Sequence, residues 1–372
     1  MKVLFTVQGE GRGHLTQAIT LERALRKDGH EVVEVLVGKS KSRKLPDFFK
    51  KKIHAPIRQF ESPNFLPTAA NKRSKVARSV AYNMMRMPRY ARSIRFLHKR
   101  IKESGADVVV NFYELLTGLT YLLYSPDVPQ VSIGHQYMFL HSDYKFPRIS
   151  RVSLVSLRFF TLVTCLGAKE RLALSFREMA DDEGRRVKVV PPLLRTDILE
   201  SHAGHGDYLH GYMVNAGFGD SVIKWHRKHR DIPLNFFWDK KGVGETVKVD
   251  DTLTFNYIDD NKFIKSMANC KAYATTAGFE SVCEAMYLGK PIMMVPAHIE
   301  QDCNAYDACL CGAGIVSRDF DIDRLLEFAE SYRPDNSFVR WAQCGGSRIA
   351  SIIEQVAAES PAFRRYGAAQ AS

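Results

Sequence analysis

Apolar and polar stretches alternate along the chain in the order of a parallel α/β protein. An apolar run at residues 2–7 is followed by a glycine-rich loop, an amphipathic stretch that ends at Lys27 and a second apolar run at residues 31–37. A strand, a helix and a second strand in this order form a βαβ unit. Another set begins at Tyr212, and the most complete one spans Tyr273 to Ile315. The pattern predicts two α/β domains, each with a parallel sheet between helices.

Further apolar runs complete the predicted sheets. We expect additional strands at residues 106–114, 130–133, 187–190, 234–238, 253–258 and 291–296, and a last amphipathic helix at residues 345–358. The hydrophilic segment 195–211 predicts the hinge between the domains. Its His202, His205 and His210 have no cysteine or acid at the spacing of a zinc site, so we interpret them as linker histidines.

Two acidic motifs stand directly before helical stretches, Asp259-Asp260 and Asp321-Ile322-Asp323. The second has the D-x-D form of a metal-binding motif. An aspartate at a helix start, however, accepts hydrogen bonds from the free backbone N–H groups there. We therefore expect both motifs to open helices, the second as an N-cap rather than as a metal site.

Length and composition are those of a folded two-domain protein. The 372 residues suffice for two cores, and 45% apolar with 25% charged residues indicates a globular chain. No apolar run approaches the ~20 residues that span a bilayer, and residues 1–14 are expected to begin a buried strand rather than a signal peptide. The seven cysteines form no Cys-x-x-Cys pair, which favours reduced thiols in a cytoplasmic protein.

The net charge of +12 is concentrated in one region. Residues 39–100 contain eighteen Lys or Arg and two acids, which leaves a net charge of about +16 there. Apolar residues such as Ile94 and Leu97 are interleaved with these arginines, and Pro88 is expected to divide the helix. This pattern suits an anionic membrane surface or a phosphorylated acceptor, and equally a solvated basic face. Nucleic acid is disfavoured because few aromatic residues are available for stacking on bases.

The stretch Tyr273 to Ile315 carries the clearest chemistry. Thr276-Ala277-Gly278 joins a strand to a helix, and the unpaired N–H groups at such a helix start bind phosphate or diphosphate. Ser281 is expected to cap the helix, and Glu284 can accept two hydroxyls such as those of a ribose. Glu300 and Gln301 follow the next strand and can bind the hydroxyls of a sugar.

The first loop, Gly9-Glu10-Gly11-Arg12-Gly13-His14, has a different character. Its G-x-G-x-G spacing is not the G-x-G-x-x-G of a dinucleotide site, and no acid follows the second strand. A nicotinamide or flavin site is thus disfavoured. An imidazole such as that of His14 can take a proton at neutral pH, whereas the alternative is that His14 only caps or packs at the helix start.

The ordered set Gly278, Ser281, Glu284, Gly289-Lys290-Pro291 and Glu300-Gln301 resembles the donor motif of nucleotide-sugar glycosyltransferases of the GT-B fold. It is similar to the UDP-glycosyltransferases and to the enzyme that adds N-acetylglucosamine to the lipid-linked peptidoglycan precursor. The resemblance implies two Rossmann-like domains with the active site in the cleft between them. It places an acceptor-binding domain at residues 1–198, a donor-binding domain at 199–352, and a helix returning to the first domain with the tail at 353–372.

The resemblance also assigns roles to residues. His14 would be the general base, with Glu114 as the acid nearby and with Gly13 and His135 on the acceptor side, His135 being the alternative base. On the donor side, the implied residues are those for the diphosphate (Gly217, Gly219, Ala277, Gly278, Phe279, Glu280 and Ser281), the nucleobase (Ile258), the ribose (Glu284) and the sugar (Glu300 and Gln301). Glu280 departs from the family pattern, because an acid there would repel phosphate unless it turns away or Arg12 compensates its charge.

The implied reaction is transfer of a hexosyl group, by preference from a UDP-sugar, to an acceptor hydroxyl. Inversion, no metal and no cofactor are expected, with a lipid-linked or membrane-associated acceptor and a cytoplasmic protein peripheral to the inner face of the membrane. Two alternatives remain open. One is an NDP-sugar epimerase of the same fold, and the other is a basic membrane- or nucleic-acid-binding protein without catalysis.

Overall fold

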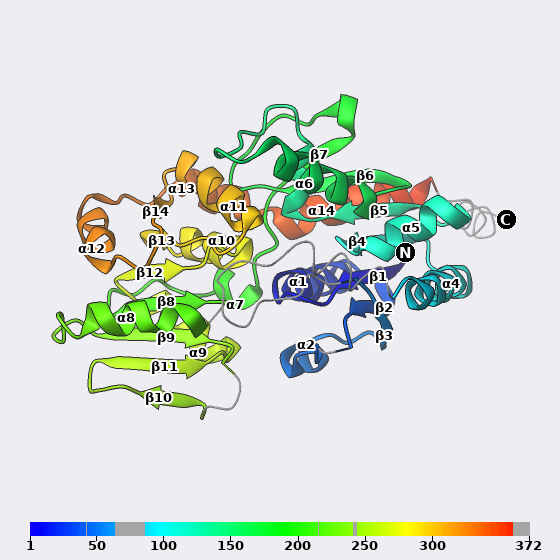
Figure 1. Cartoon of the computed structure of the whole chain (residues 1–372). Coiled ribbons are helices and arrows are strands. Elements are labelled where there is room, and N and C mark those ends of the chain that lie inside the picture. Colours follow the sequence, from blue (N-terminus) through cyan, green and yellow to red (C-terminus); the bar gives the residue numbers. More distant parts are fainter. Residues whose placement is uncertain (42, 64–85, 215, 241–243, 360–372) are drawn as a thin grey trace.

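The computed structural model describes residues 1–41, 43–63, 86–214, 216–240 and 244–359, and it contains two α/β domains side by side (Figure 1). Each domain has one sheet of seven described strands. Strands that are covered by helices on both faces bury all their side chains, which explains why they appear in the sequence as uninterrupted apolar runs. The expected α/β class with two parallel sheets is confirmed.

The N-terminal sheet is parallel throughout and has the strand order β3-β2-β1-β4-β5-β6-β7. The strand order reverses between β1 and β4, so the loops after these two strands flank the switch point where ligands bind in such sheets. The strands are β1 (Lys2–Gln8), β2 (Glu31–Lys39), β3 (Ile57–Glu61), β4 (Val108–Phe112), β5 (Gln130–Ile133), β6 (Ala168–Leu174) and β7 (Val187–Val190). The helices are α1 (Gly13–Lys27), α2 (Asp47–Lys52), α4 (Met87–Glu103), α5 (Leu115–Tyr124), α6 (Arg151–Thr164) and the short 3-10 helices η1 (His135–Leu140) and η2 (Glu183–Arg185).

The C-terminal sheet repeats this arrangement. Its order is β10-β11-β9-β8-β12-β13-β14, with only the edge strand β10 antiparallel among the described strands and a switch point between β8 and β12. The strands are β8 (Leu209–Met213), β9 (Leu234–Trp238), β10 (Thr246–Lys248), β11 (Leu253–Tyr257), β12 (Ala272–Thr275), β13 (Ile292–Met294) and β14 (Gly314–Val316). The helices are α7 (Thr196–Leu199), η3 (Ala216–Phe218), α8 (Gly219–His226), α9 (Asp260–Asn269), α10 (Phe279–Tyr287), α11 (Ile299–Leu310), α12 (Ile322–Ser331), α13 (Asn336–Gln343) and α14 (Gly345–Ala358).

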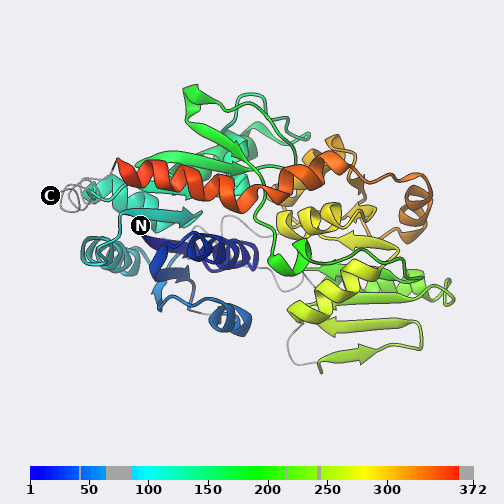
Figure 2. The same ribbon diagram turned by 180° about the vertical axis from the view of Figure 1, so that it is seen from behind.

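Helix α14 lies against the N-terminal domain. Figure 2 shows it running along that domain in front of the sheet. Gly346 packs closely on Ala24 of α1, where an added Cβ would lie 3.2 Å from the Ala24 Cβ, and Glu354 Oε1 lies 2.5 Å from His30 Nε2. The helix begins at Gly345, ahead of residue 353, where we placed the boundary.

The hinge is shorter than predicted, because strand β8 already begins at Leu209. His210, which we interpreted as a linker histidine, lies fully buried in β8, and its Nδ1 is 2.9 Å from Ser266 Oγ. Burial lowers the pKa of His210 to about 3, so its ring is neutral. In the sequence, His210 lies between Leu209 and Gly211 at the start of an apolar run that ends at Met213, and this run is the pattern that indicates a strand.

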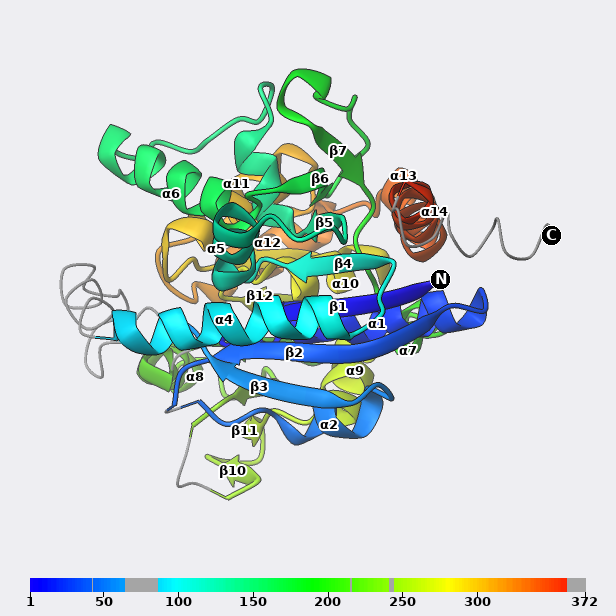
Figure 3. The ribbon, with the colours of Figure 1, turned by 90° about the vertical axis from the view of Figure 1, so that its right-hand side faces the viewer.

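Three apolar residues of α4 that we considered as membrane anchors face inward. Ile94, Leu97 and Ile101 pack on Leu4 and Leu36 in the core beneath the helix, which lies across the N-terminal sheet (Figure 3). In the described part of the span 39–100, these residues therefore do not form the membrane anchors that we considered. Pro88 lies in the first turn of α4, where a proline is tolerated. The rest of the predicted anchor segment, residues 64–85, lies outside the described residues.

The two domains share a core. One cluster of buried apolar residues includes Phe5 and Phe112 of the N-terminal sheet, Phe279 of α10 and Ile353 of α14. All seven cysteines are free. Since α10 and α14 contribute to packing with the first domain, the facing ends of the two sheets are held together by side chains rather than by the hinge alone.

Candidate active site

His14 lies at the start of α1, directly after the glycine-rich loop that follows β1. It is buried, and its ring stacks on Tyr113 with the centroids 5.6 Å apart. The ring nitrogens meet two glutamines: Nδ1 is 3.1 Å from Gln17 Oε1, and Nε2 is 3.3 Å from Gln136 Nε2. Burial lowers the pKa of His14 to about 4. The imidazole is thus neutral at pH 7 and able to accept a proton.

Glu114 occupies a different place from the one that its pairing with His14 would require. It caps helix α5, where its carboxylate accepts hydrogen bonds from Thr117 N at 2.8 Å and from Ser62 Oγ. Burial raises the pKa of Glu114 to about 7. The hydrogen-bond partners of His14 are Gln17 and Gln136, and Glu114, the acid that the sequence offered nearby, is not among them. The physical reason is that Glu114 satisfies the free N–H groups at the start of α5.

His135 lies in η1 and faces the C-terminal domain. Its ring stacks on Phe279, with centroids 4.6 Å apart and an interplanar angle of 6°, and its Nε2 is 3.4 Å from Glu300 Oε1. Burial, and then the nearby His14, lower the pKa of His135 well below its usual value. Both candidate bases are therefore neutral and lie at the boundary between the domains, with His135 packed against α10.

The predicted phosphate turn lies at the carboxyl end of β12 and leads into α10. Ala277 has a positive φ of 61°, a left-handed conformation held by a hydrogen bond of 3.2 Å from Asn304 Nδ2 to its carbonyl. Gly278 is the N-cap. Ser281, which we expected to cap the helix, lies inside it and donates to the Gly278 carbonyl at 3.2 Å. An N-terminus capped by glycine directs its backbone N–H groups and the positive end of its dipole outward.

A second helix start lies beside this turn across the switch point. Gly217 is in η3, and Gly219 begins α8, both after strand β8, which pairs with β12. Gly219 packs on Trp238, and a Cβ added at Gly219 would lie only 3.2 Å from the indole ring, which is a tight contact. Two adjacent strands thus end in helix starts, which is the geometry that binds diphosphate in doubly wound sheets.

Glu280 turns away from the phosphate turn and toward the other domain. Gln17 Nε2 donates a hydrogen bond to Glu280 Oε1, and the carboxylate lies against Gly13, where a Cβ would come within 2.3 Å of Oε2. Arg12 does not compensate this charge, since its guanidinium pairs with Asp260 at 2.8 Å and stacks over Phe48. Burial above all, and also the charge of Glu300, raise the pKa of Glu280 to about 7.

Glu284 is 2% exposed and is bound by Arg195 of the hinge. The Arg195 Nε donates to Oε1, and Nη2 donates to Oε2, each at 2.6 Å. This bidentate pair uses one lone pair on each oxygen. Sequence reasoning missed Arg195, because a single arginine 89 positions away from Glu284 carries no local sign of the pairing.

The remaining predicted donor residues have mixed surroundings. Glu300 accepts a hydrogen bond of 3.2 Å from Gln136 Nε2, and burial raises its pKa to about 7. Gln301 Oε1 instead accepts from Ala297 N at 2.9 Å within its own domain. Ile258 is half-buried after β11, and its N–H donates to the Trp238 carbonyl at 3.1 Å. Of these, only Glu300 is shown in contact with the N-terminal domain.

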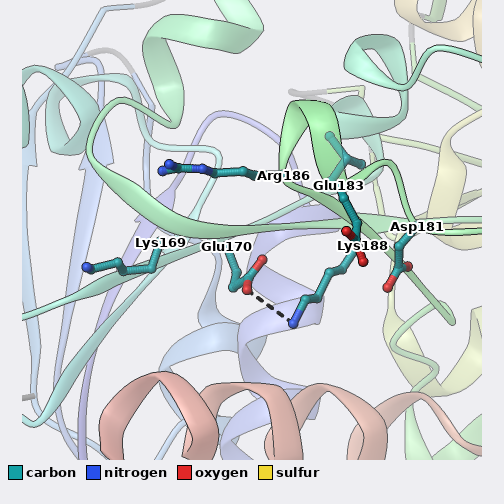
Figure 4. Close-up of a pocket in the computed structure, with 7 residues that line it drawn as sticks. Lys169, Glu170, Asp181, Glu183, Arg186 and Lys188 are labelled. Atoms are coloured by element: carbon teal, nitrogen blue, oxygen red, sulfur yellow. Dashed lines mark ion pairs between the residues drawn. The ribbon is translucent and has the colours of Figure 1, made fainter. Parts of the chain in front are cut away.

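Two open cavities lie away from these residues. One, of about 350 Å³, is lined by Lys169, Asp181 and Arg186 at strands β6 and β7, with an ion pair of 3.1 Å between Lys188 and Glu170 (Figure 4). The other, of about 400 Å³, lies between α7 and α9. Neither shares a residue with the predicted site, whose side chains are in direct contact across the domain boundary.

Among the described residues, no group of three or more His, Cys, Asp or Glu side chains is arranged to hold a metal ion. No helix in the described ranges has the length and apolar character needed to cross a membrane.

The sequence matches the family model described as glycosyl transferase family 1 over residues 1–332. No curated protein sequence matches the chain. Similar solved structures include the glycotransferase of kitacinnamycin (15% identity, TM-score 0.64, 95% of this chain and 98% of that chain covered). CalG4, the calicheamicin glycosyltransferase, is also similar, with 14% identity and a TM-score of 0.62 over 96% of this chain and 99% of that chain. Arabidopsis thaliana UGT89C1 complexed with quercetin is similar with 15% identity and a TM-score of 0.61 over 96% of this chain and 99% of that chain.

Because the identities are low, the similarity to the solved structures establishes the fold alone. The family is established by the family model, which matches most of the chain. The paired sheets, the two switch points and the returning helix α14 agree with that fold. The chain therefore belongs to glycosyl transferase family 1 and is a glycosyltransferase of the GT-B fold.

Proposed function

We propose that the enzyme transfers a sugar from a UDP-sugar to an acceptor hydroxyl with inversion. The observation that carries this proposal is the neutral His14, whose hydrogen-bond partner Gln17 reaches across the domain boundary to Glu280 in the first turn of α10. In the proposed step, the acceptor oxygen forms a bond to the anomeric carbon as the bond to the diphosphate oxygen breaks. The hydroxyl proton passes to His14 Nε2, and the electron pair leaves with UDP.

The donor would be bound by the starts of α10 and α8. Backbone N–H groups at 277–281 and 217–219, together with two helix dipoles, favour the two negative charges of a diphosphate. In this proposal they stabilise the leaving group, and neither a metal nor a cofactor is required. One solved relative, UGT89C1, is described as complexed with UDP, which supports uracil as the base. Ile258 is proposed to contact it.

The sugar and ribose contacts are proposed for Glu300, Gln301 and Glu284. Glu300 already lies at the domain boundary beside His135. Glu284 keeps one lone pair on each oxygen beyond its bonds to Arg195, and these are the acceptors that two ribose hydroxyls need. Because Glu284 is buried, we expect this contact to form only when the domains separate around the donor.

On the acceptor side, we propose a lipid-linked or membrane-associated acceptor on the inner face of the membrane. The support comes from α6, whose Val152, Val155, Phe159 and Leu162 are 77, 66, 66 and 42% exposed. Their spacing places them along one face of the helix. Arg151 at the same helix is exposed, and no acid occurs between Asp143 and Glu170. An apolar stripe with cationic neighbours suits an anionic bilayer surface.

Replacement of His14 by alanine tests the catalytic role. We expect His14→Ala to reduce transfer by about 10²-fold or more, the usual contribution of a general base, and to leave UDP binding unchanged. The exposed His205 provides the matched control, His205→Ala. Undiminished turnover in His14→Ala contradicts the assignment.

A thermal-shift screen of nucleoside diphosphates and their sugars identifies the donor, because a ligand that binds only the folded state raises the midpoint of unfolding. Conversion of the donor sugar without any acceptor would identify an epimerase.

The α6 surface is tested with vesicles. We expect the protein to sediment with anionic but not with neutral vesicles, and Phe159→Ser to weaken this binding several-fold by removing apolar area from the stripe. Val249, 43% exposed in the other domain, gives the matched control Val249→Ser. Equal binding of Phe159→Ser and the native protein at low salt would contradict a role for α6.

A further inference from the structure

A chain of hydrogen bonds joins the two domains through His14. It begins at Glu280 of α10, passes through Gln17 of α1 to His14 Nδ1, and continues from His14 Nε2 through Gln136 to Glu300 of α11. Both ends of the chain are carboxylates from the C-terminal domain, whereas the three residues between them belong to the N-terminal domain. His14 is therefore held from both sides by the opposite domain.

The direction of each hydrogen bond follows from the chemistry of the groups. Above about pH 7, where the Glu280 carboxyl is ionised, it only accepts, so Gln17 presents its NH₂ group to Glu280 and its carbonyl oxygen to His14. A carbonyl oxygen also only accepts, so His14 Nδ1 must carry the ring proton. His14 Nε2 then has a free lone pair, which is the form that a general base needs.

The contact at His14 Nε2 indicates the same tautomer, with the proton on Nδ1. Glu300 accepts from Gln136 Nε2 at 3.2 Å, which fixes the NH₂ group of Gln136 toward the site. That group lies 3.3 Å from His14 Nε2 and can donate to it only if this nitrogen is unprotonated. An acceptor hydroxyl would take the place of the Gln136 amide at Nε2.

We propose that Glu280 is a positioning residue for the catalytic base: acting through Gln17, it holds His14 in the tautomer with the proton on Nδ1 and so makes a competent base depend on contact between the two domains. The proposal rests on the role of His14 in the proposed function. It also accounts for Gly13, since any larger residue there would displace the Glu280 carboxylate. Glu280 thus replaces, from the other domain and through an amide, the carboxylate that we sought in Glu114.

The tautomer of His14 can be measured without any substrate. Nitrogen NMR of protein labelled at histidine shows which ring nitrogen carries the proton, and the loss of one signal in His14→Gln assigns it. We expect an Nδ1–H tautomer in the native protein and in Gln136→Ala, and a mixture in Gln136→Ala combined with Glu280→Ala, where Gln17 can rotate and no amide donates to His14 Nε2. In the same Gln136→Ala background, Gln17→Glu with Glu280→Gln should restore Nδ1–H, because a carboxylate then accepts directly from His14. An unchanged Nδ1–H tautomer in Gln136→Ala with Glu280→Ala overturns the proposal.

Kinetics separate positioning from simple repulsion of the donor. We expect Glu280→Gln to lower kcat by about tenfold to 10²-fold, within the range of acid-base effects, with donor affinity equal or tighter because one negative charge is gone. The control is Glu327→Gln on the exposed face of α12. If Glu280→Gln binds donor more tightly with kcat undiminished, Glu280 only repels the donor and the proposal is wrong. Absence of UDP-sugar binding by the native protein would instead refute the proposed function, while the tautomer result would stand.

Discussion

Buried carboxylates at the domain boundary make single residues sensitive to pH. Burial raises the pKa of Glu114 to about 7, whereas a glutamate in the unfolded chain titrates near pH ~4.3. Between these values the folded state binds more protons, so this residue's contribution to stability falls as pH rises from about 4.5 to 7. Glutamine does not titrate, so as pH rises over this interval we expect the free energy of unfolding of Glu114→Gln to increase relative to that of the native protein, by up to about 3 kcal/mol. Urea unfolding at a series of pH values measures the difference, and a difference independent of pH would contradict it.

At the same scale, the sequence indicates His14 but not the residues that hold it. A histidine after a glycine loop at the end of a first strand is a local pattern. Gln17 lies one helical turn further, yet an uncharged residue among many polar ones carries no sign of its role. The pairings of Arg195 with Glu284 and of Gln17 with Glu280 join positions 89 and 263 apart, so only the folded chain brings them together.

At the scale of elements, the start of α9 offers a prediction. Asp259 accepts a hydrogen bond from Lys262 N at 2.9 Å, whereas Asp321 occupies the N-cap of α12 without any side-chain cap bond. We expect Asp259→Ala to lower the free energy of unfolding by about 1 kcal/mol, the usual loss for an N-cap. The matched Asp321→Ala should change it much less. Urea unfolding of the two variants checks this, and equal losses would contradict the capping assignment.

Elements differ in how well the sequence predicts them, for a physical reason. Buried parallel strands such as β7 appear as continuous apolar runs, so their positions could be predicted closely. Periodicity also predicts helices, but it does not say which face meets the core. In α4 the apolar Ile94, Leu97 and Ile101 are buried, while in α6 an apolar stripe is exposed and Thr161 and Thr164 are buried instead. The surface that we propose for membrane binding could therefore not be located before the packing was known.

For the whole molecule, contact between the domains and access of the donor are opposed. Asp260 of α9 lies 2.8 Å from Arg12 Nη2, 3.5 Å from Lys52 Nζ and 3.8 Å from Arg195 Nη1. Two of these cations belong to the N-terminal domain and the third to the hinge. Side chains of both domains also meet directly where the donor is proposed to bind, as in the stacking of Phe279 on His135. The donor can enter only when these contacts open.

We therefore expect Asp260→Asn to favour the open arrangement, because a neutral amide attracts the three cations far less. Small-angle scattering should show a larger radius of gyration for this variant than for the native protein at low salt, and added salt should reduce the difference by screening the native pairs. Asp47→Asn is the matched control, since Asp47 pairs only with Lys50 of its own helix at 3.1 Å among the described ion pairs. If Asp260→Asn and the native protein have equal radii of gyration at low salt, these ion pairs do not hold the domains together. Opening would then depend on the apolar contacts around Phe279, and Phe279→Ala would be the variant that enlarges the molecule.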